Sequence, residues 1–155
     1  MDIREKHGFA YDAHTETDML KSVGTAIAVT EVRNEVVAPA LEALHQDMQA
    51  IGDTKVDAVE LSEAKSSYAG RFILNLERQS GRADELTRIE VLNLPSDFLD
   101  TFMTHVRSVE PDDIQKVSKQ FWTPSDATVV VVGDASKIQK SLESIGTFQV
   151  IKPQQ

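Results

Sequence analysis

Residues 4–11 read REKHGFAY, and within this stretch the pattern of the chain changes from helix to strand. The charged run before Gly8 is typical of the last turn of a helix, and glycine most readily takes the left-handed conformation that ends one. The residues that follow alternate as in a strand with one apolar face. We therefore expect a helix that ends at Gly8 and a strand over 9–15. The apolar face of that strand would carry Phe9, Tyr11 and Ala13.

The rest of the chain continues with short strand-like runs and long helical patterns. The run GTAIAVT at 24–30 favours a second strand, which predicts a hairpin with a long polar loop over 16–22. From 31 onward apolar residues recur every three or four positions, which indicates helices with one buried face. The segment ATVVVV at 127–132 is the best candidate for a buried strand, and 147–151 is a further one. The expected helices cover 31–51, 57–79, 82–92, 98–109, 111–121 and 135–144, with breaks at Gly52, at Ser80 and Gly81, at Pro95 and at Pro124.

This order of elements predicts the α+β class, with a small, mostly antiparallel sheet backed by a layer of helices. The chain has 155 residues, enough for one domain with a hydrophobic core. It shows no internal repeat, low-complexity tract or linker. We therefore expect a single domain over 1–155.

The composition disfavours several classes of function. A net charge of −9 argues against binding to nucleic acids or anionic membranes, because both need a basic surface. The chain has no cysteine, and therefore no disulfide, thiolate metal site or cysteine nucleophile. No apolar run approaches the roughly 18 residues of a membrane span, and the N-terminus lacks the layout of a signal peptide. We therefore expect neither a nucleic acid nor a membrane as partner.

The histidines are the first candidates for a metal site. Two ligands on one helical face need a spacing of four residues, as in H-x-x-E-H. The nearest pair, His7 and His14, lies seven residues apart across the predicted break. Each histidine is therefore expected at the surface, and no metal site is predicted in this chain. The four are His7, His14, His45 and His105.

Other chemistry-bearing groups give no complete active site. An acidic cluster before the helix expected at 111–121 is compatible with a cation site or with helix capping, and both interpretations stay open. The run VVVVGD at 129–134 resembles the strand end of a nucleotide-binding fold, but it lacks both glycine-rich phosphate motifs. Two adjacent serines in the helix expected at 57–79 have no histidine–aspartate partner. The acids are Glu110, Asp112 and Asp113, and the serines are Ser66 and Ser67.

Arg4 and Tyr11 lie on either side of the break at Gly8. A helix that doubles back onto its following strand can bring these two side chains close together. They would then offer a guanidinium and a phenolic O–H, which suit a carbonyl oxygen and the oxyanion formed from it. A surface arginine beside a half-buried strand tyrosine is the alternative, and the spacing alone does not choose between them.

REKHGFAY resembles a segment of the pitrilysin/insulinase zinc metallopeptidases, which include the mitochondrial processing peptidases and their bacterial relatives. The non-zinc half of these proteins carries an R-E-x-x-G-(L/F)-x-Y run where a helix ends and a strand begins. Further pieces of this chain follow in the order of that family, over about residues 1–145. These pieces are GTAIAVT, VDAVELSEAKSSYAGRF, the NLP break before a helix, EPDDIQKVSKQFWTP, and VVVVGD before a helix.

The resemblance implies the later part of one metallopeptidase C-terminal domain, a fragment without its first strand and helix. It implies that Arg4 and Tyr11 contact the substrate carbonyl and the oxyanion. The zinc and the H-x-x-E-H motif would belong to a partner half, in the same chain or a separate one, where zinc-activated water attacks the peptide. An inactive scaffold domain of the same superfamily is the alternative.

Three further expectations follow from the resemblance. The isolated chain should have no peptidase activity and hold no catalytic zinc. Its missing strand and helix should leave apolar surface exposed, so it should self-associate. Export of bacterial relatives slightly favours the periplasm over the cytoplasm.

Overall fold

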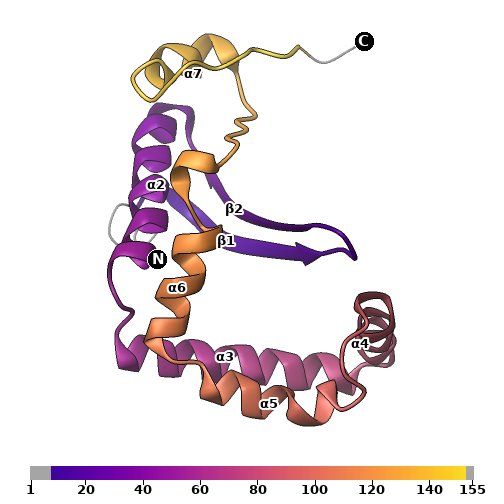
Figure 1. The fold of residues 1–155 in the computed structure, drawn as a ribbon. Helices are drawn as coiled ribbons and strands as arrows, with labels where there is room; N and C mark the ends of the chain where they lie inside the picture. The colour runs from indigo at the N-terminus through magenta and orange to yellow at the C-terminus, as the bar shows by residue number, and fades with distance from the viewer. Residues whose placement is uncertain (1–7, 153–155) are drawn as a thin grey trace. The chain divides into compact units, whose positions relative to one another are not determined.

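The structure, a computed structural model, describes residues 8–152. Its two strands form one antiparallel sheet, and the remaining regular elements are helices (Figure 1). This confirms the predicted α+β class. In chain order the elements are β1 (Ala10–Met19), β2 (Gly24–Val32), the 3-10 turn η1 (Asn34–Val36), α2 (Val37–Asp53), α3 (Ala58–Glu77), α4 (Gln79–Leu92), α5 (Phe98–Ser108), α6 (Pro111–Phe121), the 3-10 turn η2 (Pro124–Asp126) and α7 (Ala135–Leu142).

The chain divides into two compact units. The first contains 1–17, 26–50 and 122–155, and the second contains 18–25 and 51–121. The expectation of a single domain that lacks its first strand and helix is not decided by this division and stays a prediction. No helix among residues 8–152 is long and apolar enough to cross a membrane.

The hairpin of β1 and β2 is longer than expected. The predicted polar loop over 16–22 was wrong in its first half, since β1 continues to Met19. The turn is closed by Leu20, whose backbone N–H donates to the carbonyl of Val23 at 2.8 Å. Polar residues 16–18 can stay in the strand because they are exposed to water there, so a strand does not need to end where its apolar pattern ends.

The small core of the first unit joins β1 to α2. Ala13 and Ala43 are buried against each other, with Phe9, Ala10 and Leu44 packed around them. The predicted helix start at 31 was wrong, because residues 31 and 32 extend β2 and α2 begins only at Val37. Pro39 thus falls in the first turn of α2, where its missing N–H costs no helical hydrogen bond. The helix also passes the expected break at Gly52 and ends at Asp53.

The second unit is built on α3, α4 and α5. The Asp57 carboxylate accepts a hydrogen bond from the backbone N–H of Val59 at 2.8 Å, which confirms the predicted start of α3. Phe102 of α5 is 6% exposed and its ring stacks on that of Phe72 of α3, with 3.6 Å between centroids. Tyr68 and Phe98 also contact the ring of Phe102.

The break between α3 and α4 lies at Arg78, earlier than predicted. Ser80 and Gly81, expected to break the chain, lie inside the first turn of α4. Gly81 is required for another reason, since a Cβ at this position would clash with the backbone carbonyl oxygen of Asn75 at the end of α3. This glycine therefore permits close packing of two helices instead of ending one.

Residues 127–132 and 147–151 form no strand in the structure, so both of these strand predictions were wrong. Three valines of the first segment are exposed, with Val132 at 94%. Strand propensity shows that a segment suits a sheet, but a strand forms only where a neighbour accepts its backbone hydrogen bonds. Within residues 8–152 the segment 128–132 has no such neighbour.

The segment leads into α7, and that helix begins as predicted. The Asp134 carboxylate accepts hydrogen bonds from the backbone N–H of Ser136 at 3.1 Å and from its hydroxyl at 2.6 Å. Ile138 and Leu142 are the buried side chains of α7, and the helix packs on η1 in the first unit.

Candidate functional site

Gly8 lies two residues before the start of β1 and has a φ of 62°. This is the left-handed conformation that the REKHGFAY stretch predicts for it. A Cβ at Gly8 would meet no atom within 4 Å, so the backbone conformation alone explains the preference for glycine here. The chain thus turns at the expected residue before it enters the strand.

The structure describes only part of the predicted site, which consists of Arg4 and Tyr11. Arg4 lies outside the described residues, as do His7 and the helix expected before Gly8. Tyr11 lies in β1, but its side chain is likewise outside the described part. The contact between the guanidinium and the phenol therefore stays a prediction.

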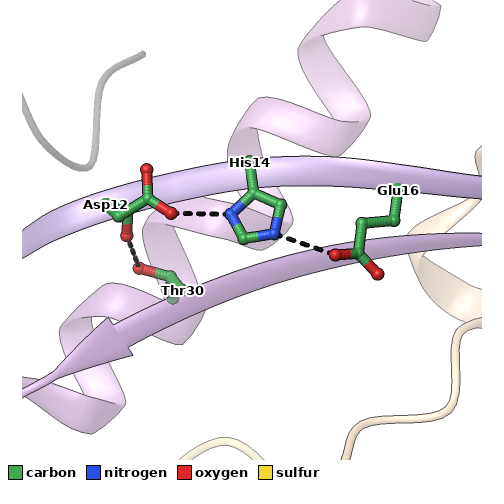
Figure 2. Close-up of polar contacts among 4 residues, drawn as sticks. All are labelled: Asp12, His14, Glu16 and Thr30. Atoms are coloured by element: carbon green, nitrogen blue, oxygen red, sulfur yellow. Dashed lines mark hydrogen bonds and ion pairs between the residues drawn. The ribbon is translucent and has the colours of Figure 1, made fainter. Parts of the chain in front are cut away.

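The exposed face of β1 carries a linked group of three side chains, Asp12, His14 and Glu16 (Figure 2). His14 Nδ1 lies 2.8 Å from the Asp12 Oδ2, and its Nε2 lies 3.2 Å from the Glu16 Oε1. The period of two along a strand places these residues on one face. Thr30 of β2 donates its hydroxyl to the Asp12 carbonyl at 3.1 Å and so ties this part of β1 to its neighbour.

These contacts change the protonation of His14. The hydrogen bond to Asp12, followed by that to Glu16, raises the pKa of His14 above its usual value. When the ring is protonated both of its nitrogens donate, one to each carboxylate. All three side chains are exposed to water, so His14 can exchange its proton directly with the solvent. It is a proton-binding group on an exposed strand face.

The sequence interpretation placed His14 at the surface, which is confirmed, but it missed the two carboxylate partners. The signal that could have found them is the spacing D-x-H-x-E within a predicted strand, because alternate strand residues are neighbours. This pattern differs from the i, i+4 spacing of ligands on a helix. His45 and His105 are also exposed, as expected.

The acidic cluster at α6 opens a helix, which favours one of the two interpretations left open. The Asp113 carboxylate accepts a hydrogen bond from the backbone N–H of Glu110 at 2.9 Å. Asp112 pairs with Lys55 at 2.6 Å. Within the described part of the chain, no group of three or more histidine, aspartate or glutamate side chains is arranged to hold a metal ion.

Ser66 also has a structural role. Its hydroxyl donates to the Ser62 carbonyl one turn earlier in α3, at 2.9 Å. Back-bonding of this kind is a common structural role of serine inside a helix.

Comparison with known proteins gives a likeness in fold. No protein-family model matches the chain, and no curated protein matches it. The fold resembles that of a protease. A crystal structure of a protease from Helicobacter pylori matches with a TM-score of 0.61 and 17% sequence identity, over 80% of this chain. The match covers 30% of the Helicobacter pylori chain, and at this identity the likeness is one of fold.

Proposed function

We propose that this chain is the non-zinc half of a zinc metalloendopeptidase of the pitrilysin/insulinase type. The fold likeness to a protease carries the proposal, because it rests on the backbone arrangement over 80% of this chain and does not depend on short motifs. The left-handed Gly8 adds to it, since the REKHGFAY stretch needs a sharp turn at this residue. The order of the further motifs along the chain points in the same direction.

In this proposal Arg4 and Tyr11 bind the substrate carbonyl. The Arg4 guanidinium holds the oxygen of the bound peptide, and the Tyr11 O–H donates to the same oxygen as it becomes an anion. Neither group changes its protonation state at neutral pH. Both therefore act as fixed donors, and the rest of the chain forms part of the wall around the substrate.

The metal belongs to the partner in this proposal. The sequence contains neither H-x-x-E-H nor a cysteine, so the zinc is assigned to an H-x-x-E-H half in the same polypeptide or a separate one. That zinc supplies the Lewis acid that activates water. This chain contributes donors to the substrate and no ligand to the metal.

The decisive experiment reconstitutes the peptidase and then removes one hydroxyl. The chain is mixed with the H-x-x-E-H half, and cleavage of a quenched fluorescent peptide is followed. We expect Tyr11→Phe to lower kcat by about 100-fold with little change in KM, because the O–H matters most in the transition state. Arg4→Ala should lower kcat and raise KM, because the guanidinium also holds the ground-state peptide.

The matched control is Tyr68→Phe, which removes the same hydroxyl from a half-exposed tyrosine of α3. This variant should cleave as the wild type does, and zinc content should be equal in all samples. A Tyr11→Phe enzyme with kcat within about twofold of wild type would make Tyr11 structural. Reconstitution without any cleavage would favour the alternative, an inactive scaffold or interaction domain of the same superfamily.

A further inference from the structure

Thr30 of β2 holds the backbone of β1 through its side chain. Its hydroxyl donates to the carbonyl oxygen of Asp12 at 3.1 Å, across 18 positions of the chain (Figure 2). Threonine suits this contact, because its branched Cβ favours a strand and its hydroxyl can donate to a carbonyl. The bond therefore fixes one point of β1 against its neighbouring strand.

That point lies directly after Tyr11, between two contacts of β1 with α2. Ala10 packs against the small core formed by Ala13 and Ala43, so the strand is held to the helix on both sides of Tyr11. Contacts between apolar groups have no preferred direction, whereas a hydrogen bond needs a defined distance and angle. The core therefore keeps β1 on α2, and the bond from Thr30 adds to the backbone pairing of the hairpin in limiting how far β1 can slide there.

We propose that Thr30 is a positioning residue of the peptidase, because it holds the part of β1 that carries Tyr11. The inference rests on the proposed function, in which the Tyr11 O–H donates to the oxyanion. Such a donor must lie within hydrogen-bond distance of the oxygen, and a small displacement of its backbone lowers the rate. Thr30 itself touches neither substrate nor metal in this proposal. Removal of its hydroxyl should therefore slow turnover and leave substrate affinity unchanged.

Two substitutions at Thr30 in the reconstituted peptidase test this. Thr30→Val keeps the branched shape without the hydroxyl, and it should lower kcat about fivefold with KM unchanged. Thr30→Ser keeps the hydroxyl and should retain at least about half of the wild-type kcat. The matched control is Thr25→Val, at an exposed threonine of β2 whose side chain makes no described hydrogen bond to β1. It should cleave as the wild type does, and circular dichroism should show every variant folded.

A double-mutant cycle with Tyr11→Phe separates positioning from a merely structural role. If Thr30 acts through the Tyr11 hydroxyl, adding Thr30→Val to Tyr11→Phe should leave kcat within about twofold of Tyr11→Phe alone. A structural role would lower kcat by the same factor in both backgrounds, and that result overturns the inference. So does a Thr30→Val enzyme with wild-type kcat, and so does a Thr30→Ser enzyme as slow as Thr30→Val.

The outcomes also distinguish this inference from the proposed function. A Tyr11→Phe enzyme slowed about 100-fold, together with a Thr30→Val enzyme of normal kcat, overturns the inference alone. Reconstitution without cleavage, or a Tyr11→Phe enzyme with wild-type kcat, overturns the proposed function and this inference with it.

Discussion

At His14 an imidazole lies between two carboxylates of its own strand, with all three side chains in water. Its side chain is 42% exposed and that of Asp12 is 63% exposed, so solvent screens the charges strongly. Exposed ion pairs of this kind contribute little to folding stability. The measurable effect is therefore on the protonation of His14 itself, and only slightly on the stability of the hairpin.

We expect Asp12→Asn to lower the pKa of His14 more than Glu16→Gln does. The bond to Asp12 is the shorter one, 2.8 Å against 3.2 Å, and it is the larger cause of the raised pKa. The measurement is an NMR titration of the His14 ring protons. Asp18→Asn is the control, because it removes one exposed carboxylate of β1 that has no described bond to His14. An equal shift in this control would mean that general charge and not the hydrogen bond raises the pKa.

The same group gives a direction for stability against pH. Because the folded-state pKa of His14 is raised, its contribution is present below the ordinary value of about 6.5 and is lost as pH rises through the folded-state value. The free energy of unfolding of wild type relative to His14→Gln should therefore be largest in mild acid. A difference that grows toward alkaline pH would contradict the assignment.

At the scale of elements, side-chain caps set where helices begin, and the absence of a side chain allows two of them to pack closely. α3 begins at the carboxylate of Asp57, and α7 begins at that of Asp134. The junction of α3 and α4 is different, because there a missing side chain matters. Gly81 lies against the backbone of Asn75, and no other residue type fits without movement.

Gly81→Ala should therefore destabilise the protein, by about 1–3 kcal/mol, because the added methyl group must displace backbone. Gly70→Ala is the matched control within α3, where a Cβ would meet no atom within 4 Å. That change should stabilise the protein by about 0.5–1 kcal/mol, because alanine is the better helix former. Urea denaturation of both variants measures the two free energies, and effects of the same sign would contradict the packing role of Gly81.

At the scale of the whole molecule, the proposed function divides the chemistry between this chain and a zinc-containing half. The sequence of this chain offers no helical pair of histidines and no cysteine, and residues 8–152 contain no cluster suited to a metal. Under the proposed function, Arg4 and Tyr11 contribute to hydrolysis only when a zinc-containing half is present. Activity should therefore be a property of the combined halves.

The purified, untagged chain should accordingly contain no stoichiometric zinc and should cleave no peptide by itself. Elemental analysis after dialysis, with the fluorescent peptide assay in parallel, measures both. The H-x-x-E-H half analysed in the same way is the control and should retain its zinc. One tightly bound zinc per chain would overturn the division of roles between the halves.

Much of the fold could be predicted because its signals are local. Asp57 and Pro111 act on neighbouring backbone groups through a hydrogen bond and a fixed φ, and each marks the helix start that the sequence indicates. Gly8 has the left-handed φ that the sequence predicts. The exposed position of His14 was also predictable. Its pairing with Asp12 was available in the spacing as well, once the segment is known to be a strand.

The sequence by itself determined the α+β class, the starts of α3, α6 and α7, and the left-handed turn at Gly8. Only the tertiary structure decided that 127–132 is not a strand, that β1 runs to Met19, and that Gly81 is a packing residue. The physical reason is range. Caps and turns depend on atoms a few residues away, whereas a strand or a close helix contact depends on which distant segment lies beside it.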